Sequence, residues 1–230
     1  MTVFRKQDLV FAKKCTRTDF LFKKNPLVGL HGIRGAFNDE ALHWLANRKL
    51  GISEAEYAVL ELIESEEVIR NVAEEKVDLG IFALANSGGG GVLSAVEAMG
   101  RYNFAVVAMF TMPVNMQLLV RPEITSAEQI TQITAHPIAM NMCLNTLEKK
   151  FPKLKLNPGT DKLDTALSAQ MLARGEIKPN SAVLASRRAS EIYGLKILTE
   201  NVHDDPNNAT VFVLIKKNLK TKIDKNPQKR

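Results

Sequence analysis

The chain of 230 residues contains only two cysteines, one tryptophan and 6% aromatic residues. Cys15 and Cys143 lie far apart in the sequence, so they provide neither a disulfide framework nor the CxxC spacing of a metal site. The four histidines are scattered, and none belongs to an HExxH pair. We therefore expect no metal ion and no cofactor, in a reduced protein of the cytoplasm.

The sequence also lacks a long apolar run. Its most hydrophobic stretch, FAVVAMFTMPVNMQLLV, is interrupted by Pro113, Asn115 and Gln117 and is shorter than the roughly 20 residues of a membrane span. The N-terminal stretch has no apolar core of the kind that signal peptides contain, because its longest apolar run is LVFA. No contact with a membrane is predicted.

The net charge of +6 arises from the two ends of the chain. Residues 1–24 contain seven Lys and Arg against two Asp, and residues 216–230 contain seven against one. The rest is mildly acidic. We interpret 1–26 as a basic N-terminal extension and 218–230 as a basic C-terminal tail, both in solvent. Because the sequence has neither interleaved aromatics nor an RNA-binding motif, a nucleic-acid partner is not expected; a tail that touches RNA or an anionic membrane is the alternative.

Strand-like and helix-like patterns alternate from residue 27 onwards. A short apolar strand, LVGLHG, precedes a glycine-rich turn and a helix for which Asn38 is the expected N-cap. AVLELI comes next, and Ser65 is the expected cap of the following helix, EEVIRNVAEEK. VDLGIFALAN is apolar on both faces, as a central strand is. This alternation is typical of an α/β protein with a mostly parallel sheet.

The second half repeats this alternation, with two strands joined at Pro113 and one long helix expected in AMNMCLNTLEKKF. We predict two lobes, the first from residues 27–105 plus 200–217 and the second from 106–199. In such folds a ligand lies in the cleft at the carboxyl ends of the strands.

Three loops are expected to face this cleft: HGIRGAF, ANSGGGG and HPIAM. A glycine-rich turn at a helix N-terminus presents N–H groups to an anion. Each loop alone is typical of a tight turn, and none is a dinucleotide fingerprint or a P-loop. Together they favour a small carboxylate or phosphate ligand. Arg34 either binds this anion or extends into solvent, and His136 is either a general acid–base or a cap.

The same loops, taken in order, resemble the catalytic domain of prephenate dehydratase from Leu27 to Ile215. LHGIRGAFNDEA is similar to the Gly-Pro-x-Gly-Thr-Phe loop of that family, and VDLGIFALANSGGGGV to its Pro-Ile-Glu-Asn-Ser segment. AHPIAMNMC is similar to Ser-His-Pro-Gln-Ala, and DTALSA to Ser-Thr-Ala-x-Ala. The end of AVLASRRASEIYGLKILTENVHDDPNNATVF resembles Asn-x-Thr-Arg-Phe. The resemblance rests on five motifs in register.

The resemblance implies an α/β fold of two subdomains, like type II periplasmic binding proteins, with a ligand cleft between the lobes. It also implies conversion of prephenate to phenylpyruvate with loss of carbon dioxide and the ring hydroxyl, and a homodimer that binds a small-molecule carboxylate. Thr210 would be the catalytic proton donor. The substrate-binding residues that it implies are Arg34, Gly35, Asn86, Ser87, Thr165, Asn208 and Phe212. We expect neither an ACT domain nor a chorismate mutase domain, and hence no feedback inhibition through an ACT domain.

Several positions depart from the family pattern. The proline, threonine, glutamate, histidine, serine and arginine of the motifs are replaced by Ile33, Ala36, Ala85, Met116, Asp164 and Val211. The change to Val211 removes a fixed cation with five hydrogen-bond donors. Three hypotheses remain: a divergent dehydratase in which Arg34 replaces the lost cation, a lyase that decarboxylates prephenate without aromatising it, and a non-catalytic binding module.

Overall fold

The structure is a computed structural model that describes residues 10–160 and 163–218. In this part of the chain, the larger sheet contains β1 (Phe11–Lys13), β2 (Leu27–His31), β3 (Ala58–Leu62), β4 (Leu79–Asn86), β5 (Gly90–Gly91), β6 (Phe104–Pro113) and β12 (Ala209–Lys217). Its helices are α1 (Arg17–Phe20), α2 (Phe37–His43) continued by η1 (Trp44–Lys49), η2 (Glu54–Glu56), α3 (Ser65–Ala73) and α4 (Leu93–Arg101).

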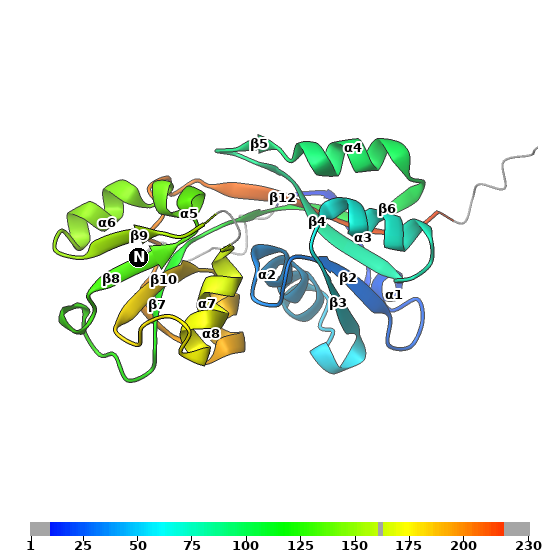
Figure 1. The fold of residues 1–230 in the computed structure, drawn as a ribbon. Coiled ribbons are helices and arrows are strands. Elements are labelled where there is room, and N and C mark those ends of the chain that lie inside the picture. The colour runs from blue at the N-terminus through cyan, green and yellow to red at the C-terminus, as the bar shows by residue number, and fades with distance from the viewer. Residues whose placement is uncertain (1–9, 161–162, 219–230) are drawn as a thin grey trace, which may run out of the picture.

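The smaller sheet contains β7 (Gln117–Val120), β8 (Gln132–Ala135), β9 (Lys155–Pro158), β10 (Ser181–Ala185) and β11 (Lys196–Thr199). Its helices are η3 (Ala127–Gln129), α5 (Pro137–Asn141), α6 (Leu144–Lys150), α7 (Thr165–Arg174) and α8 (Arg187–Tyr193). Figure 1 shows the two sheets as two lobes, the smaller on the left, with α2 lying beside α7 and α8 where the lobes meet. The predicted two-lobed α/β fold is confirmed.

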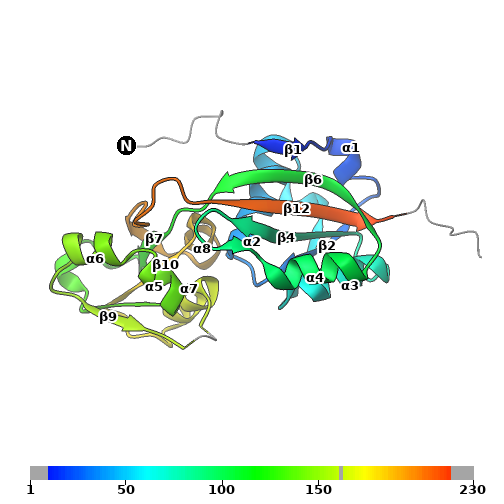
Figure 2. The same ribbon diagram turned by 90° about the horizontal axis from the view of Figure 1, so that it is seen from above.

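Both sheets are mixed, so the expectation of a mostly parallel sheet was wrong. The larger sheet has the order β1-β6-β12-β4-β2-β3, and the smaller has the order β11-β7-β10-β8-β9. β2 is parallel to β3 and β4, but β12 is antiparallel to both β4 and β6. The reason is the double crossing between the lobes: β6 leaves the larger lobe and β12 returns to it, side by side in opposite directions (Figure 2).

The crossing points differ from the predicted ones. β6 stays in the larger sheet as far as Pro113, so the expected division between residues 105 and 106 falls inside a strand. The outgoing and returning segments are hydrogen-bonded to each other: Val114 N donates to Asn208 O at 3.0 Å, and Val202 N donates to Met116 O at 2.9 Å. These backbone bonds join the lobes through a paired connection.

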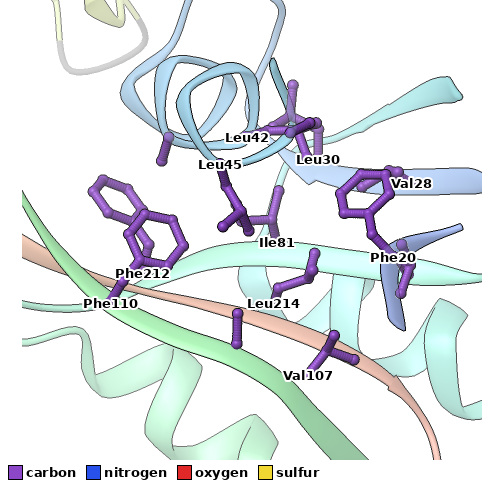
Figure 3. Packing of buried hydrophobic residues seen from close by; sticks show 14 of the residues in the cluster. Phe20, Val28, Leu30, Leu42, Leu45, Ile81, Val107, Phe110, Phe212 and Leu214 are labelled. Carbon is purple, nitrogen blue, oxygen red and sulfur yellow. The ribbon is translucent and has the colours of Figure 1, made fainter. Parts of the chain in front are cut away.

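The main core lies between the larger sheet and α2 (Figure 3). Phe20, at the end of α1, is fully buried in it. Phe11 of β1 packs on Phe110 with ring centroids 5.7 Å apart, and β1 extends the edge of the sheet beside β6. The described part of the N-terminal extension is therefore part of the fold and not a solvated tail, because Phe20 is buried in the core and Phe11 packs against it. The rest of that extension, residues 1–9, and residues 219–230 of the C-terminal tail lie outside the described residues.

Three expected helix boundaries were wrong. α2 begins one residue before Asn38, with Ala36 at the N-cap position, and α3 begins at Ser65 itself. The helix expected in AMNMCLNTLEKKF is two helices, α5 and α6. Asp204 of the returning segment accepts hydrogen bonds from the backbone N–H groups of Asn145 and Thr146, so α6 has an N-terminus of its own. None of the helices in the described ranges is long and apolar enough to cross a membrane.

Candidate functional site

Two adjoining cavities of about 240 and 230 Å³ lie between the lobes. Phe37, Met116 and Met142 line both of them. The other residues of the first cavity are Asn38, Ala83, Asn86, Val92, Val114, Asn208, Thr210 and Phe212. The other residues of the second cavity are His136, Ile138, Ala139, Asp164 and Thr165. Apolar side chains therefore make up most of the cleft, with a few polar groups among them.

An irregularity in β4 brings Asn86 to the first cavity. The register of β12 against β4 pairs Thr210 with Asn86 and Phe212 with Ala83, so β4 has one extra residue between these pairs. Such a bulge changes the face to which the following side chains point. Asn86 and Ala83 consequently line the same cavity as Thr210 and Phe212.

Asn86 holds the hydroxyl group of Thr210. Asn86 Oδ1 accepts from the backbone N–H groups of Gly88 and Gly89 at 2.8 and 3.0 Å, which fixes the orientation of the amide. Asn86 Nδ2 then lies 2.9 Å from Thr210 Oγ1 and 2.9 Å from Asn208 Oδ1. Because Thr210 Oγ1 accepts this hydrogen bond, its own hydrogen is available to a ligand in the cavity.

Asn208 has a structural role as well as a place in the cavity wall. Its side chain is 2% exposed, and its Nδ2 donates to Val114 O at 2.9 Å on the outgoing crossing segment. Phe212 is 1% exposed and packs on Phe110. The resemblance implies that Thr210 is catalytic and that Asn86, Asn208 and Phe212 bind the substrate. In the structure all four line the first cavity.

Val211 does not line either cavity. It lies between Thr210 and Phe212 in β12, and successive side chains of a strand point to opposite faces. Its cross-strand neighbours are Ala85 and Thr111. Met116, the position of the family's histidine, does line the cleft, where it contributes an apolar side chain.

The second cavity contains the polar groups of the smaller lobe. His136 Nδ1 accepts a hydrogen bond from Ile138 N at 3.1 Å, so Nδ1 is unprotonated and Nε2 carries the hydrogen. Asp164 is the N-cap of α7, and its Oδ1 accepts from Leu167 N at 2.6 Å. Thr165 is the first residue of α7. The side chains available to a ligand here are thus a neutral imidazole, a carboxylate and a hydroxyl.

Among the described residues that line the two cavities, none is lysine or arginine, and Asp164 has the only fixed charge. In the described ranges there is also no group of three or more His, Cys, Asp or Glu side chains that could hold a metal ion. The polar groups of the cleft are suited to hydrogen bonding and proton donation.

Arg34 lies away from the cleft, in an ion-pair network between the lobes. Its Nε is 3.0 Å from Asp39 Oδ1, and its Nη2 is 2.8 Å from Glu54 Oε2. Burial alone would lower the pKa of Arg34, but Asp39 and Glu54 outweigh it and raise the pKa above its usual value. Arg188 of the smaller lobe joins the same two carboxylates. The guanidinium of Arg34 is thus already paired, which contradicts the hypothesis that it replaces the lost cation in the cleft.

Gly35 and Ser87 are also absent from the cavity walls. Gly35 has a φ of +86°, and Ser186 Oγ of the smaller lobe donates to its carbonyl at 2.6 Å. A Cβ on Gly35 would lie 3.1 Å from the backbone of Ala189, so glycine permits the close contact between the lobes. Ser87 Oγ accepts from Ala209 N at 3.0 Å. Both residues support the cleft from outside.

Asn38 is a polar residue of the cleft that the sequence assigned to another role. It was expected to cap a helix, but its Nδ2 donates to His31 O at 2.9 Å. Its Oδ1 is buried and has no hydrogen-bond partner among the described residues. In the sequence, Asp164 stands out only as a departure from the family motif. The apolar lining, including Phe37 and Met142, gave no chemical signal in the sequence.

Two α/β lobes joined by two crossings, with cavities between them, define a two-lobed α/β protein with an interlobe cleft. The family model described as prephenate dehydratase matches residues 28–220 of the chain. The chain belongs to the prephenate dehydratase family.

Several individual proteins are similar to this chain. Arogenate dehydratase 1 of Petunia hybrida is 34% identical over 139 residues, which are 60% of this chain and 31% of that protein. The chain thus spans about a third of the length of the curated relatives that it matches first. The solved prephenate dehydratase of Arthrobacter aurescens, in complex with L-Phe, has a TM-score of 0.69 and 20% identity, covering 84% of this chain and 60% of that one. The quorum-quenching acylase GqqA has a TM-score of 0.67 and 25% identity, covering 85% and 65%.

Proposed function

We propose that the chain is a decarboxylating dehydratase, which removes carbon dioxide and the ring hydroxyl from a cyclohexadienol carboxylate such as prephenate or arogenate. The observation on which this rests is the hydroxyl of Thr210, which lines the first cavity while Asn86 holds its oxygen. Membership of the prephenate dehydratase family and relatives named as dehydratases support the reaction class.

The reaction needs one proton donor. As the bond to the ring carboxylate breaks, its electron pair enters the ring, and the hydroxyl on the opposite ring carbon leaves as water with a proton from Thr210. Asn86 Nδ2, 2.9 Å from Thr210 Oγ1, stabilises the charge that develops on that oxygen. Water then returns the proton to Thr210. Aromatisation of the ring drives the step, so orientation and one hydrogen-bond donor suffice.

The apolar wall of the first cavity assists the loss of carbon dioxide. Ala83, Val92, Val114 and Met116 line this cavity together with two phenylalanines. A carboxylate is poorly stabilised by such surroundings, whereas carbon dioxide is neutral. Enclosure of the ring carboxylate by these apolar side chains therefore favours its loss as carbon dioxide.

The test is to incubate the purified chain with prephenate and with arogenate and to identify the products. Phenylpyruvate or phenylalanine supports the proposal, and a non-aromatic acid indicates decarboxylation without aromatisation. Thr210→Val removes the hydroxyl at nearly constant volume and should lower kcat by roughly 10²–10⁴-fold. Thr210→Ser keeps the hydroxyl and should retain much of the activity. Equal activity of the Val and Ser variants would exclude Thr210 as the donor.

A second candidate function is ligand binding without turnover. It is favoured by the absence of lysine and arginine from the described residues that line the cleft, since a dianionic substrate is normally held by cations. Thermal stabilisation by these compounds without any product would support it. From the family resemblance we also propose a homodimer, which sedimentation of the purified chain would test.

A further inference from the structure

We infer that the cleft selects the α-amino acid form of its ring-bearing ligand over the α-keto acid form, and that Asp164 accepts the ammonium group. The inference rests on the proposed function, because it names the substrate class for the same cleft. Two further groups of the second cavity, on His136 and Thr165, fit the same ligand.

The charge of the cleft is the first argument. Asp164 lines the second cavity and has the only fixed charge among the described lining residues. An α-keto acid with a ring carboxylate has two negative charges, and each would meet this carboxylate without a neighbouring cation. The corresponding amino acid carries an ammonium group, which attracts a carboxylate strongly where water is partly excluded. The cleft thus favours the amino acid form, in which the ammonium group offsets one of the two negative charges.

The position of Asp164 is the second argument. Its Oδ1 accepts from Leu167 N at 2.6 Å at the first turn of α7, a helix of ten residues. The N-terminus of a helix favours a negative charge, and the hydrogen bond from Leu167 N fixes the orientation of the carboxylate. The other carboxylate oxygen, Oδ2, can accept a hydrogen bond from a ligand, since a carboxylate has several acceptor positions.

The second cavity also holds donors for the α-carboxylate of an amino acid. His136 carries its hydrogen on Nε2, because Nδ1 accepts from Ile138 N. Thr165 adds a hydroxyl beside Asp164 in the same cavity. An amino acid head group needs a charged acceptor for its ammonium group and hydrogen-bond donors for its carboxylate. Asp164 is the acceptor, and His136 and Thr165 are the donors. The ring would then occupy the apolar first cavity, where Thr210 lies.

The decisive variant is Asp164→Asn. Asparagine caps helices about as well as aspartate, so α7 is preserved while the charge is removed. Wild-type protein should use arogenate with a higher kcat/KM than prephenate, and Asp164→Asn should lower that preference roughly tenfold. Glu176→Gln removes one charge from an exposed position of the same lobe and should leave the preference unchanged. An unchanged preference in Asp164→Asn would show that Asp164 is only a cap and would overturn the inference.

Binding measurements separate this inference from the proposed function. L-phenylalanine and phenylpyruvate differ in the amino and keto groups and require no turnover, so calorimetry with both applies even to a protein without activity. Wild-type protein should bind L-phenylalanine more tightly, and Asp164→Asn should weaken that binding while phenylpyruvate binding is kept. Tighter binding of phenylpyruvate by the wild type would overturn the inference. Absence of turnover with all substrates, together with the expected binding order, would overturn only the proposed function.

Discussion

Val211 lies directly opposite Ala85 in the antiparallel register of β12 and β4. These are the positions at which the family motifs have arginine and glutamate, and cross-strand partners share one face of a sheet. Since the neighbours Thr210 and Asn86 line the first cavity, this face points away from the cleft. The motif resemblance would place a pair of opposite charges at these two positions, and in this chain the pair is apolar.

A double-mutant cycle tests this pairing. Val211→Arg and Ala85→Glu should each destabilise the fold by about 1 kcal/mol, because each places one charge on a half-buried site. The double variant should recover part of the loss, with a coupling of about 0.5–1 kcal/mol in chemical denaturation. Additive effects would contradict the pairing. A gain of ligand affinity in Val211→Arg alone would show that an arginine here reaches the cleft.

Asn86 should affect the chemical step more than binding. Asn86→Ala removes the N–H group that holds Thr210 Oγ1, so the hydroxyl loses its orientation. We expect kcat to fall by about 10–100-fold with little change in KM, measured by initial rates. Ser87→Ala is the matched control, because Ser87 is the next residue along the chain and does not line either cavity. Equal losses in both variants would indicate disruption of the loop.

The succession of strands and helices could be predicted from the sequence, because hydrophobic periodicity is a local property. The sequence also identified Thr165 and Thr210, whose motifs end up in the cavity walls. The role of Arg34 could not be predicted. Its carboxylate partner Glu54 lies on a separate element, and pairing follows from tertiary contacts that no local pattern encodes. The antiparallel return of β12 escaped prediction for the same reason.

The bulge in β4 shows a second limit of the sequence. One extra residue decides whether Asn86 points to the cleft or to the opposite face, and ANSGGGG reads the same in either case. The sequence likewise did not predict that Asn38 Oδ1 is buried without a partner among the described residues, because it showed only an N-cap candidate next to a glycine-rich turn. The bulge depends on the register between β4 and β12, and the position of Asn38 depends on where α2 starts. A shift of one residue in either would change the direction in which the side chain points.

Arg188 should contribute strongly to stability. It is 7% exposed, its Nε lies 3.2 Å from Asp39 Oδ2, and Asp39 is 2% exposed on the other lobe. Arg188→Ala removes one of the two arginines that pair with the buried carboxylate of Asp39. We therefore expect a loss of about 3 kcal/mol in the free energy of unfolding. Arg187→Ala is the control on the same helix. Its ion pair with Glu200 is exposed, and its loss should cost less than about 1 kcal/mol. Similar effects of both changes would show that the interlobe network is not stabilising.

Glu40 should make the stability of the protein depend on pH. It is half-buried in α2, and burial together with the charge of Glu191 on α8 raises its pKa from 4.5 to about 7, although Arg187 opposes the change. The nearby Asp39 raises this pKa further. Because the folded state holds the proton more tightly than the unfolded state, this contribution is full below pH 4.5 and is lost as the pH rises through 7.

The variant Glu40→Gln cannot ionise and should therefore be more stable than the wild type at pH 8, by about 1–2 kcal/mol. At pH 4 the two proteins should differ little, because Glu40 is then protonated in both states. Chemical denaturation of both proteins from pH 4 to pH 8 measures the difference. Glu97→Gln, at an exposed site of α4, is the control and should follow the wild type throughout. If the wild type and Glu40→Gln have parallel stability profiles, Glu40 is ionised in the folded protein and the carboxylates of α2 and α8 do not oppose each other across the interface.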